Sequence, residues 1–207
     1  MPKKFYLMSG HSSTGRLKPI DRTALNDVDN KNVLILNLTW SDKEKLKSKG
    51  DFFREYFHEL GAETVDVVED EASEEQIGEG FEKAGLIYLP GGDTRTLIGN
   101  IRKKGLDLLI SNFEGVVSGN SAGTYSLCPE YLRIRNNKIE DIIPAMGLVP
   151  FCTKAHYEPK FDPLLRELSK EREIYALQDE SAVVYDGGFN FIGNIWKFYR
   201  GYKERIN

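Results

Sequence analysis

The sequence is poor in the residues on which several classes of protein depend. Its 207 residues include two cysteines, Cys128 and Cys152, and three histidines, His11, His58 and His156. The two cysteines have no metal-like spacing and suggest no disulfide framework, so we expect neither a metal site nor a fold held by disulfides. With so few histidines, any mechanism that needs a histidine base has few candidates and is easily tested.

Long apolar runs and an excess of basic charge are also missing. No apolar stretch approaches the roughly 20 residues that span a bilayer, and the N-terminus lacks the long apolar segment of a secretory signal. The net charge of −4 offers no broad basic face for nucleic acid. The densest charge run, from Asp42 to Lys49, mixes both signs and is typical of a solvated helix face. We therefore expect a cytoplasmic protein that binds neither membranes nor nucleic acid.

Short β-rich segments alternate with longer amphipathic ones along the first part of the chain. The pattern predicts strands at 5–8, 33–38, 64–68, 86–89 and 115–117, and helices at 43–60, 73–84 and 94–110. Gly61 is expected to end the first of these helices, and Ser73 with Gln76 resembles a capping box at the start of the second. This βαβα order indicates a mostly parallel sheet flanked by helices on both faces.

The final third of the chain switches to short strands. They are predicted at 174–177, 182–185 and 189–192, and the turn Asp186-Gly187-Gly188 joins the last two as a hairpin. No linker, internal repeat or low-complexity segment interrupts the pattern. Because the length suits one substantial core better than two, the sequence predicts a single α/β domain over residues 1–207.

The pentapeptide Gly119-Asn120-Ser121-Ala122-Gly123 follows the apolar run at 115–117 and precedes a helix-tolerant stretch. It has the G-x-S-x-G pattern of a nucleophile elbow, in which a sharp strand-to-helix turn exposes a serine hydroxyl and the glycines avoid Cβ clashes. The amide of Ala122 would then face the oxyanion of a tetrahedral intermediate. An ordinary turn between a strand and a helix is the alternative interpretation.

A second glycine-containing loop, Gly91-Gly92, follows the strand predicted at 86–89. In open α/β sheets, ligands bind at the carboxyl ends of the strands, where this loop and the elbow both lie. Paired glycines leave backbone N–H groups free to approach a substrate oxygen. We therefore expect Gly92, with Gly91 as the alternate, to be the second oxyanion donor beside Ala122. A plain tight turn is the alternative.

A serine hydroxyl needs a general base to attack a carbonyl at neutral pH. His156 is the favoured candidate because it follows the apolar run at 146–151. His11, in the loop after the first predicted strand, could also reach a site at the strand ends. His58 belongs to a helical pattern with neighbouring aromatic residues, so we interpret it as helix surface or packing.

Several of these motifs occur together in a characteristic order. They are Pro90-Gly91-Gly92-Asp93-Thr94, Gly119-Asn120-Ser121-Ala122-Gly123, Cys128-Pro129, Gly147-Leu148-Val149-Pro150-Phe151 and His156-Tyr157. Together they resemble the aspartyl dipeptidase/cyanophycinase family of serine peptidases. The resemblance implies a class I glutamine amidotransferase-like α/β fold, with Ser121 as the nucleophile and His156 as the general base. It also implies that the substrate is a short peptide, such as one with an N-terminal aspartate.

The third member of the triad departs from the family pattern. The resemblance implies an acidic residue between the nucleophile and the histidine, but the nearest match by spacing falls on Asn136 or Asn137. Glu158 is favoured instead, because an extended segment would place it on the same face as His156. This H-x-E spacing is similar to that of glutamine amidotransferases. The remaining candidates are Glu140, Asp141, Asp179 and Glu180.

The sequence also suggests how a substrate could be held. Arg95, just beyond the glycine pair, could bind a substrate carboxylate through two parallel hydrogen bonds, although a surface arginine at a helix start is the alternative. Arg133 and Arg135 could do the same. The glycines at 78, 80 and 85 do not follow a strand in the order of a dinucleotide fingerprint, so we expect no cofactor.

Two other functions remain open at the level of sequence. The first is a small-molecule esterase or amidase that uses the same elbow. The second is a non-catalytic homologue that binds a ligand and lacks the triad acid. The aromatic residues Trp196, Phe198 and Tyr199 are expected to pack in the core, with a homodimer contact as the alternative.

Overall fold

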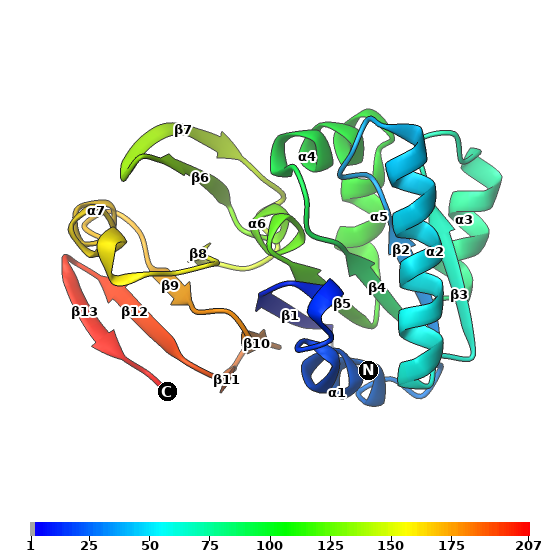
Figure 1. Cartoon of the computed structure of the whole chain (residues 1–207), viewed down its shortest axis with the longest axis horizontal. Coiled ribbons are helices and arrows are strands. Elements are labelled where there is room, and N and C mark those ends of the chain that lie inside the picture. The colour runs from blue at the N-terminus through cyan, green and yellow to red at the C-terminus, as the bar shows by residue number, and fades with distance from the viewer. Residues whose placement is uncertain (1–2) are drawn as a thin grey trace.

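The computed structural model describes residues 3–207, apart from the side chain of Ser12. Its central sheet has the strand order β11–β10–β1–β5–β4–β2–β3 (Figure 1). These strands are β1 (Lys4–Ser9), β2 (Asn32–Leu36), β3 (Thr64–Val68), β4 (Leu86–Leu89), β5 (Val116–Asn120), β10 (Ser181–Tyr185) and β11 (Phe189–Ile192). The five strands from β1 to β3 in that order are parallel, and β10 and β11 add an antiparallel hairpin beside β1.

Helices cover both faces of this sheet, as the sequence predicts. On one face lie α1 (Lys18–Asn26) and α2 (Lys43–Leu60); on the other lie α3 (Glu74–Lys83), α4 (Thr94–Lys103), α5 (Leu106–Asn112) and α6 (Ala122–Leu127). The two cores arise because successive strand residues point to opposite faces. In β1, Phe5 and Leu7 pack in the core with α3 to α6, whereas Tyr6 and Met8 pack in the core with α1 and α2.

The predicted helix signals are largely confirmed. Gly61 ends α2 in the left-handed conformation, with φ of 104°, and Ser73 with Gln76 forms the capping box of α3. The helix predicted over 94–110 is wrong in one respect, because it consists of two helices. The chain turns at Gly105, whose φ of 65° is left-handed, and a new helix starts at Leu106. The α1 helix was not predicted at all.

A second sheet lies beside the first, with strand order β13–β12–β9–β8 (Figure 1). Its strands are β8 (Cys152–Lys154), β9 (Ile174–Leu177), β12 (Ile195–Tyr199) and β13 (Tyr202–Arg205), and it packs against α7 (Asp162–Leu168), which follows a short 3-10 turn (Pro159–Phe161). Tyr175, Leu177 and Ile195 of this sheet share a hydrophobic core with strands of the first. Hence one apolar interior connects the two sheets.

The hairpin of β6 (Glu130–Arg135) and β7 (Lys138–Pro144) forms a separate two-stranded ribbon, which was not predicted. Its two-residue turn is Asn136-Asn137, with φ of 50° and 55°. Positive φ at both central positions is typical of a type I′ hairpin turn, for which asparagine is well suited. Elsewhere, Phe198 lies in the core as expected, but Tyr199 is 42% exposed. None of the helices described in residues 3–207 is long and apolar enough to cross a membrane.

Candidate active site

Ser121 stands at the turn between β5 and α6, at the carboxyl end of the parallel strands. Its φ of 51° and ψ of −100° lie outside the usual regions for a residue with a side chain, as expected for a strained elbow. The flanking glycines allow this turn because the chain is crowded there. A Cβ on Gly123 would lie 2.0 Å from the Leu89 carbonyl oxygen, and one on Gly119 would lie 2.6 Å from the Gly123 carbonyl carbon.

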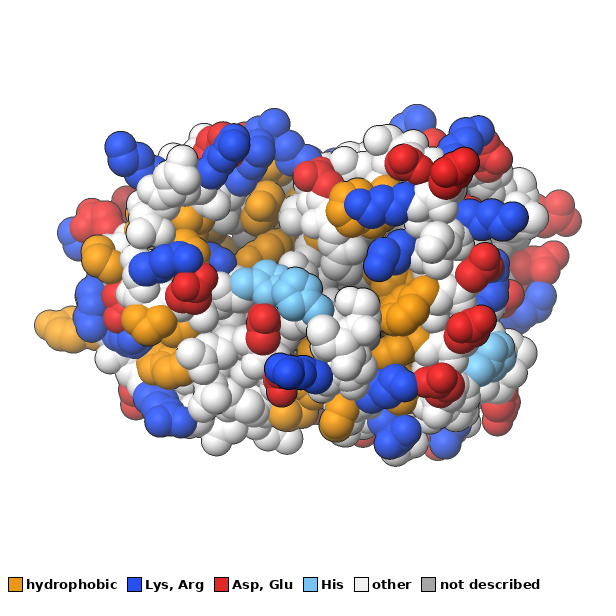
Figure 2. All heavy atoms as spheres, viewed as in Figure 1, with side chains coloured by type: hydrophobic (Ala, Val, Ile, Leu, Met, Phe, Trp, Pro, Cys, Tyr) orange, Lys and Arg blue, Asp and Glu red, His pale blue; other side chains and the backbone are white. Residues whose placement is uncertain are grey.

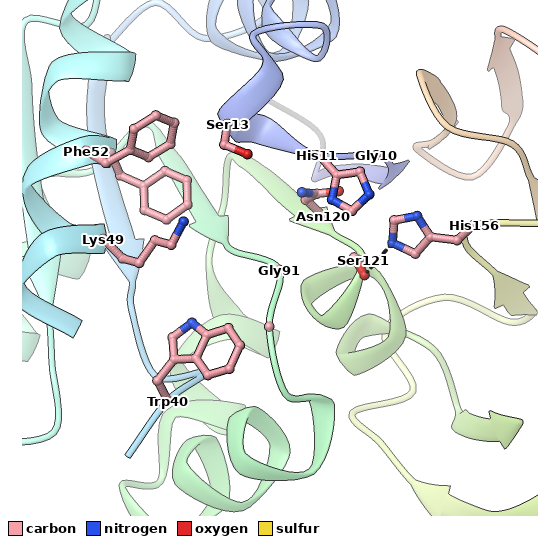
Figure 3. Close-up of a pocket in the computed structure, with 12 residues that line it drawn as sticks. Gly10, His11, Ser13, Trp40, Lys49, Phe52, Gly91, Asn120, Ser121 and His156 are labelled. Atoms are coloured by element: carbon pink, nitrogen blue, oxygen red, sulfur yellow. Dashed lines mark hydrogen bonds between the residues drawn. The ribbon is translucent and has the colours of Figure 1, made fainter. Parts of the chain in front are cut away.

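His156 follows β8 and meets the serine. Its Nε2 lies 2.9 Å from Ser121 Oγ, so the structure brings the predicted nucleophile and base together (Figure 3). The φ of His156 is 52°, another left-handed residue with a side chain. Its backbone is fixed on both sides: the His156 N–H donates to Ser9 Oγ at 2.8 Å, and the preceding Ala155 carbonyl accepts from Tyr125 Oη at 3.1 Å.

Lys154 also donates to the Ala155 carbonyl, at 2.5 Å, from a side chain that lies over the Phe161 ring. Burial lowers the pKa of this lysine to about 8, since desolvation disfavours the charged form, and nearby Glu158 partly offsets the effect. The Ala155 carbonyl therefore has two donors. This arrangement holds the chain rigidly just before His156.

Asp179, in the loop between β9 and β10, orients the histidine. Its Oδ1 lies 2.6 Å from His156 Nδ1 and accepts a hydrogen bond from Ser9 Oγ at 3.2 Å. A carboxylate accepts and does not donate, so Nδ1 carries the imidazole proton and Nε2 is left to accept from the serine hydroxyl. Antiparallel pairing of Ser9 with Ser181 brings the loop before β10 to the end of β1, where the site lies.

Glu158, the favoured acid in the sequence, does not occupy this position. Its carboxylate pairs with Lys160 Nζ at 2.6 Å, and its side chain is 59% exposed. The prediction assumed that residues 156–158 are extended, which would place alternate side chains on one face. The left-handed φ at His156 breaks that alternation, so Glu158 turns away from the imidazole.

Of the other sequence candidates, Glu180 pairs with Arg16 at 2.9 Å, and the rest lie on or near the β6–β7 hairpin. Asn136 and Asn137 form its turn, and Glu140 pairs with Arg133 at 2.8 Å. Asp141 pairs with Arg95, the predicted substrate-binding residue. Arg95 therefore faces the hairpin and is not among the residues that line the pocket at Ser121.

A pocket of about 310 Å³ opens in front of Ser121. Trp40 and Phe52 form an apolar wall, and His11 lies beside His156 on the opposite side (Figure 3). Seen from outside, two neighbouring histidine side chains lie in a hollow near the middle of the molecule (Figure 2). The third, His58, is on α2, where its Nδ1 contacts the Ala62 carbonyl at 3.2 Å, as expected of a structural histidine.

The backbone around the pocket suits an oxyanion. Ala122 is the first residue of α6, and the first N–H groups of a helix have no partner within it. Gly91 approaches the serine closely, because a Cβ there would lie 3.5 Å from Ser121 Cβ. Gly92 has φ of 151°, and a Cβ on it would lie 2.6 Å from the Thr39 side chain. Both glycines line the pocket, as their predicted role requires.

Lys49 is the pocket residue that the sequence did not reveal. It belongs to the charged segment of α2 that was interpreted as a solvated face, yet its half-buried side chain reaches the pocket (Figure 3). Its ammonium lies 5.6 Å from the centroid of the Phe52 ring. In the described part of the chain no carboxylate forms an ion pair with Lys49, so its charge is available to a ligand. A sequence signal was lacking because Lys49 is one of several lysines in a segment of mixed charge.

A serine on an elbow of an α/β sheet, bonded to a histidine that is bonded to an aspartate, is the arrangement of a serine hydrolase. The model of peptidase family S51 matches residues 6–191. The chain belongs to this family and is a serine peptidase, which confirms the resemblance drawn from the sequence. Among curated proteins, none matches the chain in sequence.

Solved structures agree with the fold. A peptidase from an acI-B1 actinobacterium superposes with a TM-score of 0.75 at 16% sequence identity, covering 100% of this chain and 94% of that one. A peptidase E-type protein from Listeria monocytogenes EGD-e superposes with a TM-score of 0.62 at 20% identity, covering 100% of both chains. At these identities the likeness concerns the fold, and it confirms the predicted mostly parallel sheet flanked by helices.

Proposed function

We propose that this peptidase hydrolyses short peptides through a covalent ester on Ser121, with His156 as general base and Asp179 as the acid that orients it. The observation that carries the proposal is the continuous chain of hydrogen bonds from Ser121 Oγ through His156 to Asp179, at 2.9 and 2.6 Å. Asp179 is a carboxylate in the place where the family spacing located none, which favours a catalytic site over a non-catalytic homologue.

The proposed reaction follows from this geometry. His156 Nε2 takes the hydroxyl proton as Ser121 Oγ attacks the scissile carbonyl, and Asp179 stabilises the imidazolium that forms. The N–H groups of Ala122 and of Gly92, or its neighbour Gly91, stabilise the oxyanion. His156 then gives its proton to the leaving amine. A water molecule, activated by the same histidine, hydrolyses the ester and restores the serine.

We further propose that the preferred peptides carry an acidic group near the scissile bond, as in aspartyl dipeptides. Lys49 supports this preference, because its side chain lines the same pocket as Ser121 and forms no ion pair within residues 3–207. Arg95, the residue first expected in this role, has Asp141 as its partner. The apolar wall of Trp40 and Phe52 lowers the local dielectric, which strengthens an attraction between Lys49 and a substrate carboxylate.

The proposal is tested by the hydrolysis of aspartyl dipeptides and chromogenic aspartyl amides. Ser121→Ala and His156→Ala should each lower kcat by about a millionfold, the size of loss seen for subtilisin when its serine or histidine is removed. Circular dichroism checks that both variants fold. Wild-type labelling of Ser121 by a fluorophosphonate without peptide turnover would retain the hydrolase but indicate an ester or amide substrate. No turnover and no labelling would refute the mechanism.

The substrate preference has its own matched pair of variants. Lys49→Met should raise KM for aspartyl substrates about 10- to 100-fold, the value of a hydrogen bond to a charged group, and leave neutral dipeptides little affected. Lys47→Met changes an exposed lysine on the same helix and serves as the control. Equal effects of the two substitutions, or equal effects on acidic and neutral substrates, would contradict a role for Lys49.

Two further expectations from the sequence stay proposals. A cytoplasmic location can be tested by cell fractionation.

A homodimer through the aromatic residues near the C-terminus can be tested by analytical ultracentrifugation, since Tyr199 and Tyr202 are 42% and 78% exposed.

A further inference from the structure

The loop after β1 brings a second histidine to the proposed base and acid. The His11 ring stacks on that of His156, with centroids 5.1 Å apart and an interplanar angle of 26°. His11 Nε2 lies 3.9 Å from Asp179 Oδ2. One ligand atom from each of His11, His156 and Asp179 lies within 4.8 Å of the other two. The acyl-transfer steps proposed above give His11 no role.

The pairing of strands explains why these three residues meet. His11 comes just after β1 and Asp179 just before β10, and these strands pair antiparallel with Ser9 opposite Ser181. The Glu180 N–H also donates to the Ser9 carbonyl at 2.7 Å, which fixes the two loops against each other. His156 arrives from β8 of the second sheet. The cluster therefore forms only in the folded chain, and no short sequence spacing encodes it.

We propose that His11, His156 and Asp179 form a binding site for a transition-metal ion such as Zn²⁺, and that the bound ion inhibits the peptidase. Two imidazoles and one carboxylate suit zinc, whereas Mg²⁺ and Ca²⁺ prefer oxygen ligands throughout. Three protein ligands leave the fourth tetrahedral position to water, because Ser121 Oγ lies at the other ring nitrogen of His156. This site is a regulatory one, distinct from a resident catalytic cofactor.

The geometry needs only a small adjustment to hold the ion. At zinc–ligand distances of about 2.0–2.2 Å, the ligand atoms of a tetrahedral site lie about 3.3 Å apart, so the most distant pair must approach by at most about 1.5 Å. The side chains of His11 and Asp179 are 66% and 45% exposed. Because these side chains are exposed, we expect them to rotate toward a common ion without movement of the strands.

The ion inhibits the enzyme because of which ring nitrogen of His156 it binds. His156 Nδ1 faces Asp179 and is the atom available to the cluster, while Nε2 faces Ser121. A neutral imidazole carries a single proton, so coordination at Nδ1 moves that proton through solvent to Nε2. Nε2 then donates a hydrogen bond and no longer accepts the serine proton. This inhibitory effect rests on the proposed function, whereas binding of the ion does not.

The binding experiment titrates tag-free protein with Zn²⁺ in competition with a chromogenic chelator. Wild type and Ser121→Ala should each bind one ion per chain in this site, and Mg²⁺ should not displace it. His11→Ala should weaken binding by at least the roughly 10- to 100-fold that loss of an outer-shell partner costs. His58→Ala removes a histidine of α2 and should bind zinc as the wild type does. Equal affinities for His11→Ala and wild type would refute the site.

The activity experiment measures the zinc concentration that halves each variant's own rate. Wild type and His58→Ala should be inhibited at the concentration where the site fills, and a chelator should restore the rate. His11→Ala should need a concentration higher by the same factor as its loss of affinity. Zinc binding that depends on His11 but leaves the wild-type rate unchanged would refute inhibition. Because Ser121→Ala is titrated for binding alone, a failure of the serine mechanism is seen separately.

Discussion

The two halves of the proposed active site are held in place in different ways. The nucleophile half, on β5 and α6, is fixed by backbone contacts: the Ser121 N–H donates to the Met8 carbonyl at 3.0 Å, and Gly123 packs directly on Leu89. The acid–base half, on the loops after β8 and β9, has backbone bonds as well, but side-chain hydrogen bonds orient its functional groups. Ser9 Oγ binds the His156 N–H at 2.8 Å and Asp179 at 3.2 Å.

This difference explains which functions are sensitive to which substitutions. Close backbone contacts leave no room for a larger side chain. Adding atoms to the nucleophile half should therefore lower the stability of the fold. Side-chain hydrogen bonds orient catalytic groups but contribute little to core packing. Removing a polar atom from the acid–base half should therefore lower activity more than stability. The variants below are chosen to separate these two responses.

The largest effect is expected at the acid. Asp179→Asn should lower kcat by about 10⁴-fold with little change in stability, because an amide favours the wrong imidazole tautomer, as it does in Ser-His-Asp peptidases. Glu158→Gln is the matched control. Because it removes only an exposed ion pair, it should change kcat by at most about fivefold. Steady-state kinetics and thermal unfolding distinguish the two. A larger loss of kcat in Glu158→Gln than in Asp179→Asn would reinstate Glu158 as the orienting acid.

The next effect concerns stability in the helical layer beside the parallel strands. Asp21 on α1 is fully buried; its Oδ2 accepts from Tyr56 Oη at 2.6 Å, and its Oδ1 has no hydrogen-bond partner within the described residues. Burial raises the pKa of Asp21 to about 7, an effect that the Tyr56 hydrogen bond partly offsets. Between pH 4 and 7 the unfolded chain is therefore ionised while the folded one remains protonated.

It follows that the free energy of unfolding should decrease as pH rises through this window. Over the full difference between the unfolded and folded pKa of Asp21, the free energy of unfolding falls by on the order of 4 kcal/mol. Asp21→Asn keeps an acceptor for Tyr56 and should remove this decrease, so its advantage over wild type should grow from pH 4 to pH 8. Urea unfolding at several pH values measures the trend. Parallel stability curves for the two proteins would contradict the raised pKa.

A smaller loss of stability is expected at the elbow. Gly123→Ala places a methyl group against the Leu89 carbonyl and should destabilise the fold by about 1–3 kcal/mol, the usual result of overpacking. Gly99→Ala, on α4, is the matched control because its added Cβ would meet nothing within 4 Å. It should stabilise the chain by about 0.4–1 kcal/mol. If both substitutions stabilise the protein, backbone packing does not hold the nucleophile half.

The smallest effect tests the link between the halves. Ser9→Ala should lower kcat about tenfold at nearly constant KM, because loss of about 1.4 kcal/mol of orienting hydrogen bonds leaves substrate binding intact. Ser118→Ala removes another fully buried serine, on β5, whose hydroxyl lacks a hydrogen-bond partner among residues 3–207. That control should keep wild-type kinetics. Rescue by Ser9→Thr, but not by a larger apolar residue, would identify the hydroxyl as the orienting group.

The nucleophile half could be predicted from the sequence because its determinants are local. Ser121 needs only its flanking glycines and a buried strand before it, all of which are visible in seven or eight consecutive residues. The same holds for the central strands and for the caps of α2 and α3. His156 was favoured because it follows an apolar run, the resemblance to peptidases implied the same residue, and the structure bonds it to the serine.

The remaining parts depend on contacts that local patterns do not encode. Asp179 reaches the histidine because β10 pairs with β1, and Glu158 misses it because His156 has a left-handed φ. The local sequence does not distinguish Lys49 from the other lysines of its helix, and only the fold brings it to the pocket. The break at Gly105 was overlooked because apolar periodicity continues across it.

The position of β10 has a consequence for the moment at which activity begins. During synthesis, Ser121 leaves the ribosome roughly 3 to 12 seconds before Asp179. Until β10 inserts beside β1, the emerging polypeptide presents a serine whose base lacks its orienting carboxylate. Under the proposed mechanism, full catalytic competence therefore begins only once the antiparallel edge has docked.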